Sequence, residues 1–139
     1  MTGISQNAGV IYRHDTRTSI HEFHVWDMRP ASVNQWFDSL SELEQTALES
    51  QEHLCCLYFI YGIWPTPYAI KRILDLSRQS PPALMLSSAI VPIGCTEEII
   101  RMLEDTLRQL PAYSDYKRQI FLFAGEAAEW LHERRAARG

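Results

Sequence analysis

The sequence predicts an α/β fold of the order ββαβαβαβα, with helices packed on a mostly parallel sheet of four to five strands. Short apolar runs typical of strands alternate along the chain with longer segments whose apolar residues recur at helical spacing. This alternation is typical of a parallel sheet built with right-handed crossovers. A polar turn between the first two runs predicts that the first strand joins the sheet as an antiparallel partner.

The first two strands are predicted within residues 10–27, VIYRHDTRTSIHEFHVWD, around a turn near HDTRT. Alternation along the second run places His24 and Trp26 on one face of the sheet, and His21 and Phe23 on the other. These residues therefore indicate a β-hairpin.

The segment RPASVNQWFDSLSELEQTALES, residues 29–50, changes to a helical period. Ser32, followed three positions later by Gln35, predicts a capping box at its start. The next run, Leu54–Gly62, is short, continuously apolar and rich in aromatic residues, as expected of a strand covered on both faces. This run is predicted to form the centre of the sheet.

Two further helices and a strand follow. Thr66 before Pro67 predicts the cap and the first position of a second helix, and residues 83–91 form the next apolar strand. Thr96 precedes two glutamates that suit the positive end of a helix dipole, so a third helix is expected to begin there and to end at Pro111.

The end of the chain predicts a last strand, RQIFLFA at residues 118–124, and a closing helix, GEAAEWLHERR at residues 125–135. Ala127, Trp130 and Leu131 recur at helical spacing in that helix and are expected to turn inward. The strand and the helix complete the predicted order.

Composition favours a soluble single domain. The 139 residues contain no repeat or long linker, so one domain is expected over residues 10–139, with residues 1–9 disordered or frayed. A formal charge of −4 makes nucleic acid an unexpected partner. No apolar run approaches the roughly 18 residues of a membrane helix, so stable membrane insertion is not expected. Three cysteines and no secretory leader favour reduced thiols and a cytoplasmic location.

Aromatic side chains gather where the predicted central strand ends. Tyr61, Trp64 and Tyr68 lie there, with Thr66 among them. Open parallel sheets bind ligands outside the carboxyl ends of their strands, so these four residues are predicted to contact a partner protein or a small apolar ligand. The alternative interpretation is that half of the aromatic residues fill the core and the others cover a sheet edge.

Cys95 is the candidate reactive thiol. It lies immediately before the third predicted helix, where backbone amides and the helix dipole can lower the pKa of a thiol. Glu97 and Glu98 oppose that effect, and no positioned base is visible, so a plain loop cysteine is the favoured interpretation.

No metal, cofactor or catalytic residue is predicted. His21 and His24 lie three apart on a strand and therefore face opposite sides, which argues against a shared metal ion. Glycine-rich phosphate loops and the other familiar cofactor and hydrolase motifs do not occur. The carboxylates of the first helix, Glu44 among them, are expected to lie on its solvated outer face.

The element order from Val10 to Arg135 and the ending RQIFLFAGEAAEWL resemble the STAS-like family of bacterial domains related to anti-sigma-factor antagonists. The likeness is to the small stand-alone members that are also compared with lipid-binding SEC14 domains. In signalling members a Ser or Thr that follows the central strand is phosphorylated. The resemblance makes Thr66 the matching hydroxyl, although prolines flank it, no acidic residue precedes it, and a helix cap already explains it.

Three hypotheses about function follow. The first is a non-enzymatic regulatory or protein-binding module of STAS-like type that presents the GIWPTPY loop to a partner. The alternative, implied by the SEC14 likeness, is a carrier of a small apolar or lipid-like ligand bound near the C-terminal ends of the strands. The third is an enzyme that uses Cys95 as nucleophile. A homodimer formed through an aromatic edge stays open in each case.

Overall fold

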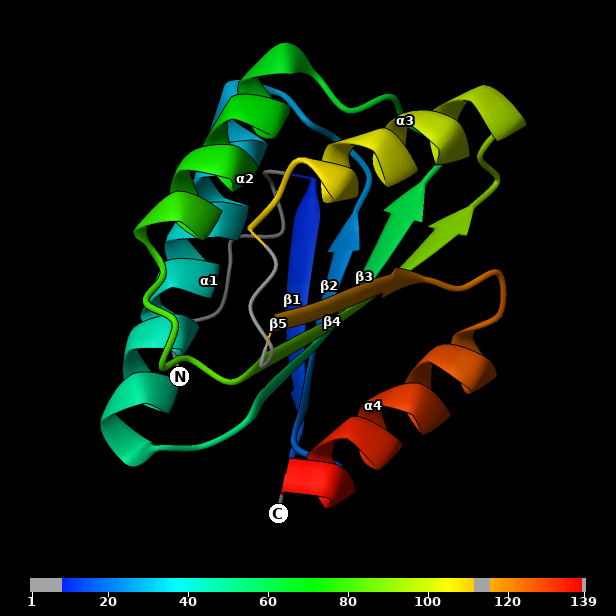
Figure 1. Ribbon diagram of the computed structural model, residues 1–139. Coiled ribbons are helices and arrows are strands. Elements are labelled where there is room, and N and C mark those ends of the chain that lie inside the picture. Colours follow the sequence, from blue (N-terminus) through cyan, green and yellow to red (C-terminus); the bar gives the residue numbers. More distant parts are fainter. Residues whose placement is uncertain (1–8, 112–115, 139) are drawn as a thin grey trace.

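The computed structural model describes residues 9–111 and 116–138 and has the predicted α/β fold, with the order ββαβαβαβα (Figure 1). The strands are β1 (Val10–Asp15), β2 (Ile20–Val25), β3 (Leu54–Tyr61), β4 (Leu86–Ile93) and β5 (Tyr116–Ile120). They lie in the sheet in chain order; β1 pairs antiparallel with β2, and the other neighbours are parallel. The predicted frayed segment, apart from Gly9, lies outside the described residues.

The four helices cover the two faces of the sheet unequally. They are α1 (Pro30–Ser50), α2 (Pro67–Gln79), α3 (Glu97–Arg108) and α4 (Ala124–Arg138). Strands that follow one another in chain order, joined by right-handed crossovers, bring α1, α2 and α3 to the same side of the sheet. We call that side the three-helix face. Helix α4 follows the last strand and packs on the opposite side, which we call the α4 face (Figure 1).

Alternation along the strands fills a core on each face. On the three-helix face the rings of Phe23 and Tyr58 lie 5.5 Å apart, and Trp36 of α1 packs against them. On the α4 face, Ala127 and Leu131 of α4 are fully buried against β3 and β4. The two large clusters confirm that β3, the predicted central strand, is buried on both sides.

The predicted start of the first helix is wrong. Helix α1 begins at Pro30, its N-cap is Arg29, and the cap makes no side-chain hydrogen bond. Proline is well suited to the first helical position, so the helix starts ahead of Ser32, which lies buried inside its first turn. The predicted Ser32–Gln35 capping box therefore does not form.

The last strand also differs from its prediction. Strand β5 spans Tyr116–Ile120, whereas the apolar run predicted a strand that continues to residue 124. Leu122 and Phe123 lie beyond β5 with 66 % of each side chain exposed. The chain leaves the sheet here because α4 must turn to the opposite face, so continuous apolarity does not mark the end of the strand.

Thr66 is the N-cap of α2, as predicted, and we expect its removal to destabilise the protein. Its Oγ1 accepts a hydrogen bond from Ala69 N at 3.1 Å and donates one to Met28 O at 3.1 Å. Thr66→Ala removes both, so the free energy of unfolding should fall by about 1–2 kcal/mol in urea denaturation.

Thr96→Ala is the matched control, because Thr96 caps α3 with a longer bond of 3.4 Å to Ile99 N. We expect a smaller loss from this variant, and Thr66→Ser should restore most of the stability. Equal losses from Thr66→Ala and Thr96→Ala would show that the bond to Met28 contributes nothing.

Candidate functional site

A cavity of about 90 Å³ lies between the three-helix face and the helices that cover it. Its wall is mainly apolar and comes from Met28, Phe37, Leu40, Ile60, Ile73, Leu76, Leu86, Ile90, Leu103 and Leu107. Polar groups reach it from Trp36, Glu44, Tyr58, Ser77, Ser88, Thr106 and Arg118. We call this space the interior cavity.

Helical and strand periodicity explain why these residues meet. Residues 36, 40 and 44 of α1 recur every four positions and so form one stripe. Residues 73, 76 and 77 of α2 and 103, 106 and 107 of α3 supply equivalent stripes. On β3, β4 and β5, alternate positions point to the same face. The interior cavity therefore lies where three amphipathic helices meet one face of the sheet.

Glu44 is the carboxylate of the interior cavity, and its predicted place on the solvated outer face of the helix is wrong. Only 7 % of the residue is exposed. It follows Leu40 by four positions and precedes Ala47 by three, so it falls on the apolar stripe of α1. That spacing was the sequence signal that could have identified it.

Burial raises the pKa of Glu44, and the hydrogen bond with Ser80 and the positive charge of Arg118 oppose the rise. Glu44 Oε1 lies 2.5 Å from Ser80 Oγ, and Ser80 Oγ lies 2.9 Å from Leu76 O. A hydroxyl has one proton for these two acceptors. When Glu44 is protonated it can donate to Ser80, which then donates to Leu76, so the neutral acid satisfies both contacts.

Arg118 is the cation of the interior cavity. It lies on β5, donates from Nη1 to Pro111 O at 3.1 Å, and its guanidinium lies 5.2 Å from the ring centre of Tyr116. Burial lowers the pKa of Arg118, while the nearby groups of Tyr58, Tyr116 and Glu44 favour its charge. Within residues 9–111 and 116–138 no carboxylate lies at ion-pair distance from it. Arg118 and Glu44 thus face one cavity without forming an ion pair.

The interior cavity also contains a buried hydrogen-bond donor without a partner among the described residues, and a tyrosine hydroxyl that already has hydrogen-bond contacts with Cys56 and Ser88. The indole Nε1 of Trp36 is buried and has no hydrogen-bond partner among the described residues. Burial strongly raises the pKa of Tyr58, which keeps its phenol protonated and able to donate. Buried donors without partners are rare in proteins, because each costs about 1–3 kcal/mol. The arrangement suits a ligand that brings an acceptor into an apolar space.

The four residues predicted to form a site do not meet in one place. Tyr61 points to the α4 face, whereas Thr66 caps α2 beside the other layer. Tyr68 donates to Asn34 Oδ1 of α1 at 2.5 Å, and 52 % of Trp64 is exposed. The hydroxyl of Thr66 is engaged on both sides by backbone groups, and its phosphorylation stays a prediction.

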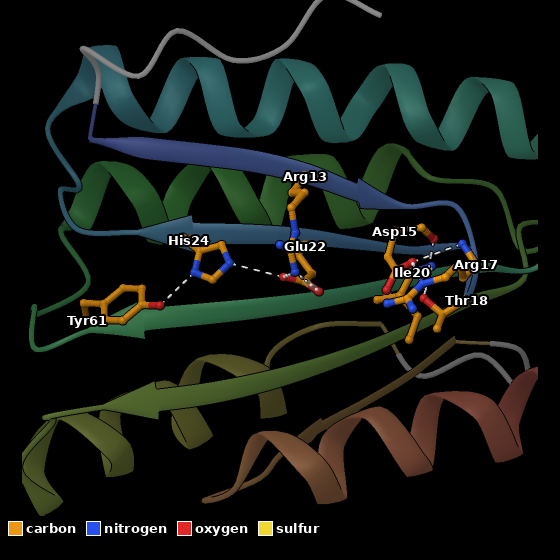
Figure 2. A network of polar contacts seen from close by, with 8 residues as sticks. All are labelled: Arg13, Asp15, Arg17, Thr18, Ile20, Glu22, His24 and Tyr61. Carbon is orange, nitrogen blue, oxygen red and sulfur yellow. Dashed lines mark hydrogen bonds and ion pairs between the residues drawn. The ribbon is translucent and has the colours of Figure 1, made fainter.

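Tyr61 instead belongs to a row of polar contacts across β3, β2 and β1 on the α4 face (Figure 2). Its hydroxyl donates to His24 Nδ1 at 2.7 Å, because desolvation and the charge of Glu22 raise the pKa of Tyr61. The other imidazole nitrogen, Nε2, therefore carries the proton and donates to Glu22 Oε1 at 3.3 Å. Glu22 also pairs with Arg13 at 3.2 Å.

Stacking holds this row in place. The ring of His24 lies 4.6 Å from that of Phe59, and the rings of Trp26 and Tyr61 lie 4.7 Å apart. The row orders the side chains beside the part of the sheet on which α4 packs, β3 and β4. None of its residues lines the interior cavity.

Cys95 is half-buried in the loop before α3. Its thiol lies 3.5 Å from Ile60 O and 3.8 Å from Ile93 O, two backbone carbonyls that can accept its hydrogen. Within the part of the chain that the structure describes, no three His, Cys, Asp or Glu residues are grouped so that they could hold a metal ion. The hydrogen-bond contacts of the Cys95 thiol within the described residues are with backbone carbonyls, which cannot act as a base to activate it.

Comparison with protein-family models, with curated proteins and with solved structures found no match to this chain. The STAS-like resemblance therefore stays a prediction. As for the membrane, the helices in residues 9–111 and 116–138 are too short or too polar to cross one.

We expect the buried carboxyl group of Glu44 to make stability depend on pH. Its pKa is raised in the folded protein, so the folded state gains from the protonated form and loses that stability as the pH rises through the raised value. Glu44→Gln keeps a neutral group that can donate to Ser80. The variant should therefore be more stable than the wild type at pH 7, and this advantage should shrink as the pH falls towards 4.5, the ordinary value for Glu.

The measurement is urea denaturation across that pH range, with Glu42→Gln as the control on the exposed side of the same helix. A Glu42→Gln curve that runs parallel to the wild type is expected. If the stability of Glu44→Gln also runs parallel to that of the wild type across the pH range, the carboxyl group of Glu44 titrates alike in the folded and unfolded states. The interpretation that burial raises its pKa would then be wrong.

Proposed function

We propose that this chain is a non-enzymatic regulatory module of STAS-like type that binds a small, mainly apolar carboxylate in the interior cavity. The single observation that carries the proposal is that, among the described residues, the Trp36 N–H has no hydrogen-bond partner and the Arg118 guanidinium has no ion-pair partner in a mainly apolar wall. This develops the predicted alternative of an apolar-ligand carrier, with the ligand placed under α1–α3 instead of at the GIWPTPY loop.

The size of the cavity limits the ligand. One water needs about 10–15 Å³ of such space, so about 90 Å³ accommodates a molecule of a few non-hydrogen atoms. A lipid chain would need a much larger space. The volume therefore favours a short aliphatic or single-ring carboxylate over a lipid.

The charges of the cavity favour an anionic head group. Arg118 is partly desolvated, and its contacts within the described residues are with a backbone carbonyl and a ring, so a carboxylate would give it a full counter-charge. Glu44 sits on the opposite wall, and its raised pKa favours the neutral acid, which reduces its repulsion of an anion. The Trp36 N–H supplies a further neutral donor.

The test uses benzoate and butyrate as probes and follows the indole N–H resonance of Trp36 by NMR, assigned with Trp36→Phe. We expect a saturable shift with at least one probe, whereas the neutral analogues benzene and butanol should bind more weakly. Arg118→Gln should weaken carboxylate binding about tenfold or more, because a charge-assisted hydrogen bond is lost.

Leu103→Phe, which fills the cavity from α3, should abolish binding, and Met102→Phe on the exposed side of the same helix should not. Absence of any shift at Trp36 up to millimolar probe would contradict the proposal. Equal effects of Leu103→Phe and Met102→Phe on binding would also contradict the proposal, because the ligand would then lie outside the cavity.

A second candidate is the predicted protein-binding module, which we place in the cytoplasm. The observation that favours it is the exposure of the GIWPTPY loop, where Trp64 is 52 % and Tyr68 36 % exposed. Large exposed aromatic residues are typical of protein-binding surfaces.

We expect Trp64→Ser to lose a partner that the wild-type protein retains in affinity purification. Ile93→Ser is the control, because Ile93 is an exposed apolar residue outside the loop. Identical sets of retained proteins for wild type and both variants would count against a binding role of the loop.

A further inference from the structure

A second and larger cavity, of about 520 Å³, lies at the end of the sheet where the parallel strands begin, opposite the end that carries the GIWPTPY loop. Its imidazole and basic lining comes from His14, His21, His53 and Arg135. The apolar part of its wall includes Leu54 and Met85. We call it the histidine cleft; it shares no lining residue with the interior cavity.

Arg135 brings a positive charge to this cleft from the far layer. The last turns of α4 end beside the turn between β1 and β2 (Figure 1). There the guanidinium of Arg135 donates to Thr18 O and, at 2.8 Å, to Ser19 O. Within the described residues no carboxylate lies at ion-pair distance from Arg135 or from the neighbouring Arg134, which donates to Ser87 Oγ at 3.2 Å. Arg135 therefore lines the cleft without an acidic partner among the described residues.

One imidazole nitrogen at the cleft, Nε2 of His21, can donate a hydrogen bond and has no partner among the described residues. The rings of His14 and His21 stack at 4.2 Å with 6° between their planes. Tyr12 donates to His21 Nδ1 at 2.6 Å, because burial raises the pKa of Tyr12 to about 12 and keeps its phenol protonated. The proton of neutral His21 is therefore on Nε2, which has no hydrogen-bond partner among the described residues.

The surroundings of His21 disfavour its protonation in the absence of an anion. Burial, together with the electrostatic effects of His14 and Arg135, lowers the pKa of His21 to about 4. The titratable and charged groups around it are Tyr12 and His14 on β1, Cys56 beside it on β3, Glu52 and His53 before β3, and Arg135 on α4. Glu52 is the single carboxylate in that set.

We propose that the histidine cleft binds a small organic anion, a phosphate monoester or a carboxylate, with Arg135 as its charge partner and His14 and His21 as its imidazole donors. An anion supplies a counter-charge for the Arg135 guanidinium, which has no carboxylate at ion-pair distance among the described residues, in a chain whose overall charge is −4. It also favours protonated imidazole, so binding is coupled to proton uptake and strengthens as the pH falls. The apolar wall accepts the body of the molecule.

The test uses isothermal titration calorimetry with phenyl phosphate and phthalate as probes, at pH 6 and pH 7.5 and in buffers of different ionisation enthalpy. We expect saturable binding of at least one probe, tighter at pH 6, with protons taken up by the protein. Binding of one probe or of both supports the proposal. The probe that binds shows whether the cleft accepts a carboxylate, a phosphate monoester or either group.

Two variants locate the binding. Arg135→Gln should weaken it about tenfold or more, whereas Arg17→Gln, which removes an exposed charge in the neighbouring turn, should change it little. Glu52→Gln should strengthen it about two- to fivefold, because a repelling charge on an exposed side chain is removed without disturbing the core.

The proposal would be overturned if neither probe binds at pH 6. Equal losses of affinity in Arg135→Gln and Arg17→Gln would also overturn it, as would an unchanged affinity in Glu52→Gln. The NMR resonances separate this site from the interior cavity. Phenyl phosphate and phthalate should shift the imidazole signals of His14 and His21 and leave the Trp36 indole unmoved, so either site can fail alone.

Discussion

The right-handed crossover is the constraint on which the other features of this molecule depend. Because the strands follow one another across the sheet in chain order, each crossover places its helix on the same face, and three helices share it. The interior cavity lies under these three helices. Among the described helices, α4 alone packs on the opposite face, over β3 and β4, and the row of Tyr61, His24 and Glu22 lies on that same face.

Buried charge gives the interior cavity its chemical character. Glu44 and Arg118 are both withdrawn from water, yet they do not pair with each other, so the desolvation of each is offset by weaker contacts. Ser80 holds the carboxyl group, and the carbonyl of Pro111 with the ring of Tyr116 holds the guanidinium. Well-packed apolar residues in place of buried ionisable groups are often at least as stable, so the presence of Glu44 and Arg118 here agrees with the binding role that we propose.

The two hollows differ because different parts of the fold build them. The interior cavity is enclosed by helix stripes and is mainly apolar, whereas the histidine cleft lies where turns and helix ends meet at the start of the parallel strands. Arg135 connects the layers there, since it extends from α4 on one face to the turn before β2.

The sequence by itself determined the element order, the sheet centre at β3, the caps at Thr66 and Thr96, and the inward turn of Ala127 and Leu131. These follow from local periodicity and cap chemistry, which act over a few residues. Only the tertiary structure decided that Glu44 and Arg118, far apart in the chain, face one cavity, and that Arg135 reaches the β1–β2 turn. Such sites depend on the relative placement of three or more elements, and no local pattern of spacing records that placement.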